Sequence, residues 1–118
     1  MTHHPKLITL IVPCYNEAEA LPLFYAETSK IISQIKDYNF EFLFVDDGSQ
    51  DNTLEIIKSL ANSDSRVKYL TFSRNFGKEA AMLAGLENSQ GDLVAMMDAD
   101  LQDPPSLLPE MIHFIEDG

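Results

Sequence analysis

Short apolar runs alternate along the chain with longer segments of helical periodicity. Runs dense in Val, Ile, Leu or Phe, each followed by polar or turn residues, predict four strands: Leu7 to Val12, Phe40 to Val45, Val67 to Phe72 and Leu93 to Met97. Apolar residues recurring every three or four positions predict four helices: Ala18 to Lys36, Asp51 to Asn62, Gly77 to Asn88 and Pro105 to Glu116. The predicted order is therefore βαβαβαβα.

This alternation favours parallel strands joined by right-handed helical crossovers. The predicted strands carry few polar residues, which is typical of strands covered on both faces. We therefore expect an α/β fold with three layers, α/β/α, and a mostly parallel sheet, formed by residues 1–118 as a single domain. In such sheets ligands bind beyond the carboxyl ends of the strands.

Charge and cysteine content narrow the classes of function. The 8 basic and 19 acidic residues give a net charge of −11, which disfavours nucleic acid as a partner and favours cations. The single cysteine, Cys14, cannot form an internal disulfide, and no secretory signal is evident at the N-terminus, so we expect a cytoplasmic location. No apolar run approaches the roughly 20 residues that cross a bilayer.

Two carboxylates, Asp98 and Asp100, follow the last predicted strand. In extended chain, residues two apart point to the same side, so both carboxylates would face one point. A hard divalent cation with oxygen ligands, Mg²⁺ or Mn²⁺, would relieve their repulsion, and Gln102 and Asp103 add oxygen atoms nearby. The alternative is an ordinary acidic pair in a loop.

A second acidic pair, Asp46 and Asp47, ends the second predicted strand. Gly48 is expected at positive φ, and Ser49 or Asp51 as the N-cap of the next helix. At a strand end, the two carboxylates could accept hydrogen bonds from a nucleobase or a ribose. A role in the turn alone remains the alternative.

Other polar residues also follow the predicted strands. Tyr15 is either a core aromatic or a face for base stacking, and Glu17 could accept hydrogen bonds from hydroxyls. Arg74 and Lys78 could hold a phosphate or balance the acidic charge, while Cys14 is expected to be structural. Neither a G-x-G-x-x-G motif nor a complete P-loop is present, which weakens dinucleotide oxidoreductase and P-loop kinase hypotheses.

Four motifs together resemble the inverting family-two glycosyltransferases of GT-A fold. The match is to the branch of dolichol-phosphate mannose synthases and bactoprenol glucosyltransferases, and it extends from about Ile8 to Pro105. The motifs are Ile11-Val-Pro-Cys-Tyr-Asn-Glu17, Phe44-Val-Asp-Asp-Gly-Ser49, Ser73-Arg-Asn-Phe-Gly-Lys-Glu79 and Met97-Asp-Ala-Asp-Leu-Gln-Asp-Pro-Pro105. The resemblance implies that the chain is the Rossmann-like, nucleotide-binding half of a GT-A fold.

The resemblance also implies a role for individual residues. The expected nucleotide-sugar contacts are Pro13, Tyr15, Glu17, Asp46, Asp47, Lys78, Asp98 and Ala99. Among these, Asp46 and Asp47 would contact base and ribose, and Lys78 would lie near the phosphates. Asp98 and Asp100 are expected as the catalytic, metal-binding DxD pair, with Gln102 as a further ligand of Mg²⁺ or Mn²⁺.

The implied reaction transfers a sugar, with inversion, from UDP-glucose, GDP-mannose or a relative to a polyprenyl phosphate at the cytoplasmic face of the membrane. The acceptor phosphate would attack the anomeric carbon while the metal stabilises the departing diphosphate. The chain ends without a closing strand, so we expect a fragment of a longer protein that binds nucleotide weakly and transfers nothing alone. Exposed apolar surface is expected to promote self-association, giving a homo-oligomer.

Two alternative functions remain. A receiver-type signalling domain also binds Mg²⁺ at strand ends, but its acidic pair belongs after the first strand, whereas here the pairs follow the second and fourth. A non-catalytic nucleotide-binding scaffold would carry the same half-site without sugar transfer.

Overall fold

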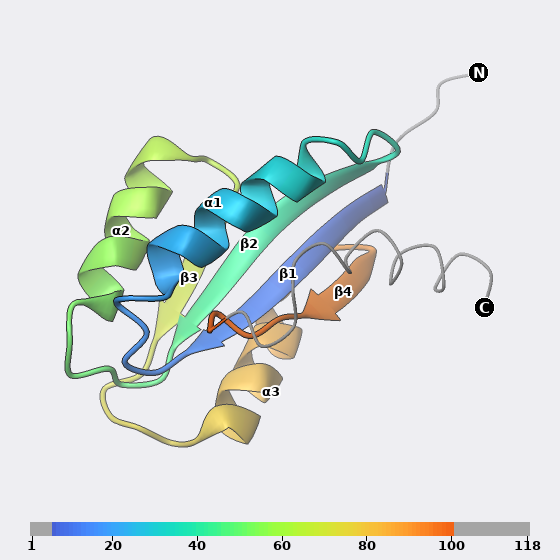
Figure 1. The fold of residues 1–118 in the computed structure, drawn as a ribbon. Helices are drawn as coiled ribbons and strands as arrows, with labels where there is room; N and C mark the ends of the chain where they lie inside the picture. Colours follow the sequence, from blue (N-terminus) through green and yellow to red (C-terminus); the bar gives the residue numbers. More distant parts are fainter. Residues whose placement is uncertain (1–5, 101–118) are drawn as a thin grey trace.

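The computed structural model describes residues 6–100 of the chain and contains seven elements over that range (Figure 1). They are β1 (Lys6–Cys14), α1 (Leu21–Ile32), β2 (Tyr38–Asp46), α2 (Thr53–Ser63), β3 (Val67–Thr71), α3 (Lys78–Asn88) and β4 (Leu93–Met96). All four predicted strands and the first three predicted helices are thus confirmed. The predicted helix over 105–116, together with Gln102 and Asp103, lies outside the described residues.

The four strands form one sheet in the order β3-β2-β1-β4, and each neighbouring pair is parallel. Helices α1 and α2 cover one face of the sheet and α3 covers the other, as Figure 1 shows. The predicted three-layer α/β/α arrangement is therefore confirmed. The chain runs from β1 outward to β3 and then returns to the far side of β1 as β4, so the strand order reverses between β1 and β4.

Helix α1 is shorter at both ends than its periodicity predicts. It begins at Leu21 rather than Ala18, with Pro22 in its first turn, where the missing N–H of proline removes no helical hydrogen bond. After Ile32 the backbone tightens, because Gln34 and Ile35 donate to carbonyls three residues earlier, at 3.1 Å each. The apolar stripe of a helix thus identified the element but not its ends.

The core on the α1 and α2 side is built around aromatic side chains of β2. Alternate β2 residues face this side, and the Phe42 and Phe44 rings stack with centroids 5.6 Å apart. Phe24 of α1 meets Phe44 edge-on at 6.4 Å. These rings are fully buried, so the packing anchors α1 over the middle of the sheet.

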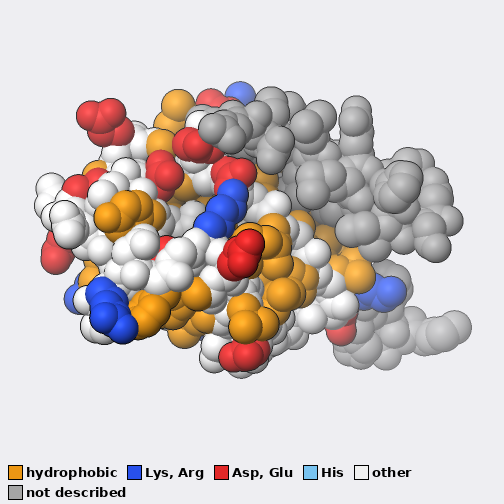
Figure 2. Space-filling model, turned by 90° about the horizontal axis from the view of Figure 1, so that it is seen from below, with side chains coloured by type: hydrophobic (Ala, Val, Ile, Leu, Met, Phe, Trp, Pro, Cys, Tyr) orange, Lys and Arg blue, Asp and Glu red, His pale blue; other side chains and the backbone are white. Residues whose placement is uncertain are grey.

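Helix α3 approaches the opposite face of the sheet closely. A Cβ added to Gly85 would lie 2.5 Å from Cγ2 of Ile11 in β1, so glycine permits this contact. The outer side of α3 leaves Leu83 and Leu86 exposed. Figure 2, which views the molecule from the side on which α3 lies, shows hydrophobic side chains gathered on this surface. Over residues 6–100, no helix has the length and apolar character needed to span a bilayer.

Candidate functional site

A pocket of about 530 Å³ lies at the carboxyl-terminal edge of the sheet, where the strand order reverses. Segments that follow all four strands contribute to it. Its lining comprises Pro13, Cys14, Tyr15, Glu17, Asp47, Asn75, Gly77, Lys78, Asp98, Ala99 and Asp100. Open parallel sheets bind ligands at this position, because the loops after β1 and β4 diverge there and leave a crevice.

The loop after β1 is held in place by the loop after β2 and by the first residue of α2. Ser49 Oγ accepts a hydrogen bond from the Asn16 backbone N–H at 2.9 Å, and Thr53 Oγ1 accepts one from the Glu17 N–H at 2.8 Å. Asn16 has a φ of 53°, in the left-handed region that asparagine tolerates better than most residues. This anchored turn presents Tyr15 and Glu17 to the pocket.

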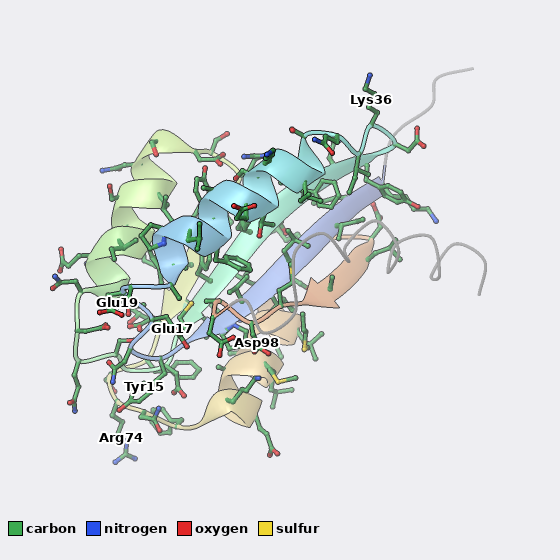
Figure 3. The ribbon with its side chains drawn as sticks, viewed as in Figure 1. Tyr15, Glu17, Glu19, Lys36, Arg74 and Asp98 are labelled. Carbon is green, nitrogen blue, oxygen red and sulfur yellow. The ribbon has the colours of Figure 1, made fainter. Side chains whose placement is uncertain are left out.

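Tyr15 is 42% exposed, so the interpretation of this residue as a core aromatic is wrong. Figure 3 shows Tyr15, Glu17 and Asp98 at the same end of the sheet, with Lys36 at the opposite end. An exposed aromatic face at the edge of a pocket suits stacking against a planar ring.

Acidic groups crowd this edge of the sheet. Desolvation raises the pKa of the Glu17 carboxyl above its usual range, and the negative charges of Asp100, Asp51 and Asp98 raise it further. A cation bound beside Asp98 and Asp100 would offset this repulsion. The electrostatics of the pocket therefore favour a positively charged ligand or a ligand that arrives with a cation.

Asp47 is almost completely buried, yet it reaches the pocket lining. Its Oδ1 accepts a hydrogen bond from the Phe76 N–H at 2.7 Å, and its Oδ2 accepts from the Gly77 N–H and from Asn75 Nδ2, both at 3.0 Å. All three donors belong to the loop between β3 and α3. Asp47 therefore holds this loop in the conformation that starts α3 at Lys78.

Asp46, its neighbour, is not part of the pocket lining. Its oxygens accept hydrogen bonds from the Ser49 N–H at 3.2 Å and from Thr71 Oγ1 at 3.0 Å. Gly48 has a φ of 69°, which confirms the predicted positive φ. Helix α2 begins at Thr53, and its N-cap residue is Asn52 rather than the predicted Ser49 or Asp51. Asp51 precedes the cap, and its Oδ1 accepts a hydrogen bond from the Thr53 N–H at 2.9 Å.

The two candidate basic residues differ in position. Lys78 Nζ lies 2.7 Å from Oδ1 of Asp98, so a cation already sits within the acidic pocket. The Arg74 guanidinium instead lies over the Phe76 ring, 4.8 Å from its centroid. Arg74 is not part of the lining, and its side chain points away from the sheet in Figure 3.

Asp98 and Asp100 both line the pocket, and Ala99 between them is buried. Oxygen donors of this kind suit Mg²⁺ or Mn²⁺, which commonly use one or two protein carboxylates and complete their shell with waters and substrate phosphates. Across residues 6–100, no group of three or more His, Cys, Asp or Glu side chains converges as a metal site. Asp98 and Asp100 are chemically suited to supply part of such a coordination shell.

Three lining residues were not predicted as site residues: Cys14, Asn75 and Gly77. Burial raises the pKa of the Cys14 thiol strongly, with the charges of Glu17 and Asp46 adding to the effect, so the thiol stays neutral and unreactive. This agrees with its expected structural role. Asn75 and Gly77 enter the lining through the loop that Asp47 holds, a contact between residues about 30 positions apart.

Comparison with known proteins places the chain in a family. The model of glycosyl transferase family 2 matches residues 9–118, and the chain therefore belongs to this family, as its motifs predict. It is 49% identical over 106 residues to a bactoprenol glucosyl transferase of Shigella phage SfX, covering 90% of this chain and 34% of the phage protein. It is 38% identical over 117 residues to an undecaprenyl-phosphate 4-deoxy-4-formamido-L-arabinose transferase of Yersinia pestis, covering 96% of this chain and 35% of the relative.

Solved structures confirm the GT-A type of fold. The chain superposes with a TM-score of 0.72 on a Pyrobaculum calidifontis mannosyltransferase in complex with GDP-Man and Mn²⁺, at 26% identity over 95% of this chain and 33% of that one. The chain thus spans about a third of the length of the relatives it matches. Membership of the glycosyltransferase family also decides against the receiver-domain alternative.

Proposed function

We propose that this chain is the donor-binding part of a glycosyltransferase that transfers a sugar, with inversion, from a nucleotide sugar to a polyprenyl phosphate at the cytoplasmic face of a membrane. Two relatives, named for transfer to bactoprenol and undecaprenyl phosphate, support the acceptor class. The structural relative that holds GDP-Man supports the donor class.

The observation that carries the proposal is the composition of the pocket where the strand order reverses. The lining includes the exposed ring of Tyr15 and the charged side chains of Asp98, Asp100 and Lys78. A nucleoside diphosphate has a planar base at one end and an anionic diphosphate at the other. The Tyr15 ring suits the base, and the ammonium group with the cation-binding carboxylates suits the diphosphate.

Asp98 and Asp100 would hold Mg²⁺ or Mn²⁺ beside the diphosphate, with Gln102 as a further ligand. When bound, the metal supplies positive charge that stabilises the departing diphosphate. Lys78 would add a second cation at the same place, because its ammonium group already lies at Asp98. Both carboxylates are thus proposed as catalytic residues.

The two acids at the end of β2 are proposed to act differently. A carboxylate has about four acceptor positions, and three protein donors occupy those of Asp47, so one position remains for a nucleotide N–H or hydroxyl. Asp46 lies outside the lining and supports the site by holding the turn at Ser49. Pro13, Glu17 and Ala99 complete the proposed contacts with the nucleotide sugar.

The acceptor does not need a strong general base. The second pKa of a phosphate monoester is about 6, so a polyprenyl phosphate is already largely a dianion near neutral pH. Its oxygen can therefore attack the anomeric carbon directly. For this reason none of residues 6–100 is assigned as a base in the proposed mechanism.

Calorimetric titration of UDP, GDP and their sugar conjugates, with and without Mn²⁺, tests the donor site. We expect metal-dependent binding that is lost in Asp98→Asn and in Asp100→Asn. Asp37→Asn is the matched control, because this exposed residue precedes β2 at the opposite edge of the sheet and carries the same charge. Equal binding by all three variants would refute the assigned site.

A chimera separates a transferase from a non-catalytic nucleotide-binding scaffold. This chain would replace the matching third of a bactoprenol glucosyl transferase, and transfer of labelled glucose to polyprenyl phosphate would be measured. We expect transfer that depends on Asp98. A folded chimera that binds nucleotide but transfers nothing would favour the scaffold.

A further inference from the structure

The ammonium group of Lys78 pairs with the carboxylate of Asp98. The proposed function assigns that same carboxylate to a divalent cation. The two residues are 20 positions apart, and Nζ of Lys78 lies 2.7 Å from Oδ1 of Asp98. Both also border a second, smaller hollow of about 90 Å³, lined by Pro13 and three methionines, Met82, Met96 and Met97. The ion pair thus borders both the polar pocket and this largely apolar hollow.

The loop before α3 positions Lys78 next to Asp98. Asp47 accepts hydrogen bonds from the N–H groups of Phe76 and Gly77, and Gly77 has a φ of 103°, which turns the chain into α3. Lys78 is the first residue of that helix. A buried carboxylate directly after β2 therefore determines where the lysine side chain begins, and that side chain places its ammonium group against Asp98.

The pair is built so that it can open. The Lys78 side chain is 60% exposed and that of Asp98 is 27% exposed, and exposed ion pairs contribute little to stability. Lysine is a compact charge on a flexible stem with four carbons, so its ammonium group can swing to another anion without moving the backbone. A divalent cation on Asp98 would repel the ammonium group, whereas a diphosphate beside that cation would attract it.

We propose that Lys78 is an exchangeable counter-ion of Asp98. In the ligand-free chain its ammonium group neutralises the carboxylate and competes with a divalent cation for it. When a cation and a nucleoside diphosphate bind together, the ammonium group moves from Asp98 to a phosphate oxygen. The same residue thus weakens binding of the bare cation and strengthens binding of the cation with its nucleotide. This inference rests on the proposed donor site.

The test measures Mn²⁺ binding alone and Mn²⁺ binding together with UDP or GDP, by calorimetry, in the wild-type chain and in Lys78→Met. Loss of the competing charge is expected to tighten binding of Mn²⁺ alone roughly two- to fivefold, the range that corresponds to an exposed ion pair. Loss of a charged contact to phosphate is expected to weaken nucleotide binding in the presence of Mn²⁺ about tenfold. The two effects have opposite signs, which a general loss of structure cannot produce.

Two further variants control for charge. Lys36→Met removes the same charge at the opposite end of the sheet (Figure 3) and is expected to change neither affinity. Lys78→Arg keeps a cation at Asp98 and is expected to bind Mn²⁺ alone as the wild type does. Thermal unfolding of each variant checks that it is folded.

The outcomes distinguish this inference from the proposed function. If Mn²⁺ binding depends on Asp98 but is unchanged or weaker in folded Lys78→Met, the exchange is refuted and the metal site stands. Equal Mn²⁺ affinity of Lys78→Met and Lys78→Arg also refutes the exchange. If the wild type and Lys78→Met both fail to bind Mn²⁺, with or without nucleotide, the exchange and the metal site are both refuted.

Discussion

Replacing Asp47 by asparagine tests whether this carboxylate organises the loop before α3. The substitution keeps the size of the side chain, removes its charge and turns one acceptor oxygen into a donor NH₂ group. If the NH₂ group takes the position of Oδ2, it faces the Gly77 N–H and Asn75 Nδ2, which are both donors at 3.0 Å. If it takes the position of Oδ1, it faces the Phe76 N–H, which lies at 2.7 Å.

Either orientation leaves at least one backbone N–H without its acceptor. Asn75 cannot compensate by rotating its amide without loss, because Nδ2 also donates to the Asp47 backbone oxygen at 3.2 Å. A hydrogen bond to a charged acceptor contributes about 1.5 to 3 kcal/mol. We therefore expect Asp47→Asn to lower the free energy of unfolding by about 2 to 3 kcal/mol.

Asp46→Asn is the matched control, because Asp46 and Asp47 are 2% and 3% exposed and carry the same charge. The carbonyl oxygen of Asn can retain the Ser49 N–H, while the Thr71 hydroxyl can reverse and accept from the new NH₂ group. A loss below about 1 kcal/mol is expected. Urea denaturation followed by circular dichroism measures both variants. Equal losses, or a larger loss in Asp46→Asn, would show that hydrogen-bond direction does not explain the role of Asp47.

Two further predictions concern backbone conformation and pH. A Cβ on Gly48 would lie 2.2 Å from the Arg74 carbonyl carbon, whereas one on Gly77 meets nothing within 4 Å, although both residues have positive φ. Gly48→Ala is therefore expected to cost at least about 2 kcal/mol and Gly77→Ala about 1 kcal/mol in urea denaturation, and equal costs would contradict the clash. Hydrogen bonds from Arg66 hold the pKa of Asp64 well below its usual range, so this carboxylate stabilises the fold above a pH of about 4, and that stabilisation is lost as pH falls through the lowered value. In thermal unfolding, the deficit of Asp64→Asn relative to wild type should shrink as pH falls below 4, and a deficit independent of pH would contradict this assignment.

Local sequence patterns determined the elements and their order. Runs dense in Val, Ile, Leu or Phe identify all four strands, and periodic apolar positions identify α1, α2 and α3. The pattern does not locate the ends of α1, because these depend on Pro22 in the first turn and on shorter hydrogen bonds after Ile32. Since parallel strands bring their carboxyl ends to one edge, the order of elements also predicts where the polar residues gather.

The role of each residue at that edge was decided by tertiary contacts. Asp46 and Asp47 are adjacent and chemically identical, yet Asp46 pairs with Thr71 across the sheet, and Asp47 reaches the pocket and the loop before α3. Similarly, only the fold brings the Lys78 ammonium group against the Asp98 carboxylate and leaves the Tyr15 ring exposed. These contacts join residues 20 to 30 positions apart, and they depend on strand register and helix position. Sequence determines which groups arrive at the edge of the sheet, whereas packing determines which of them face the ligand and which hold the others in place.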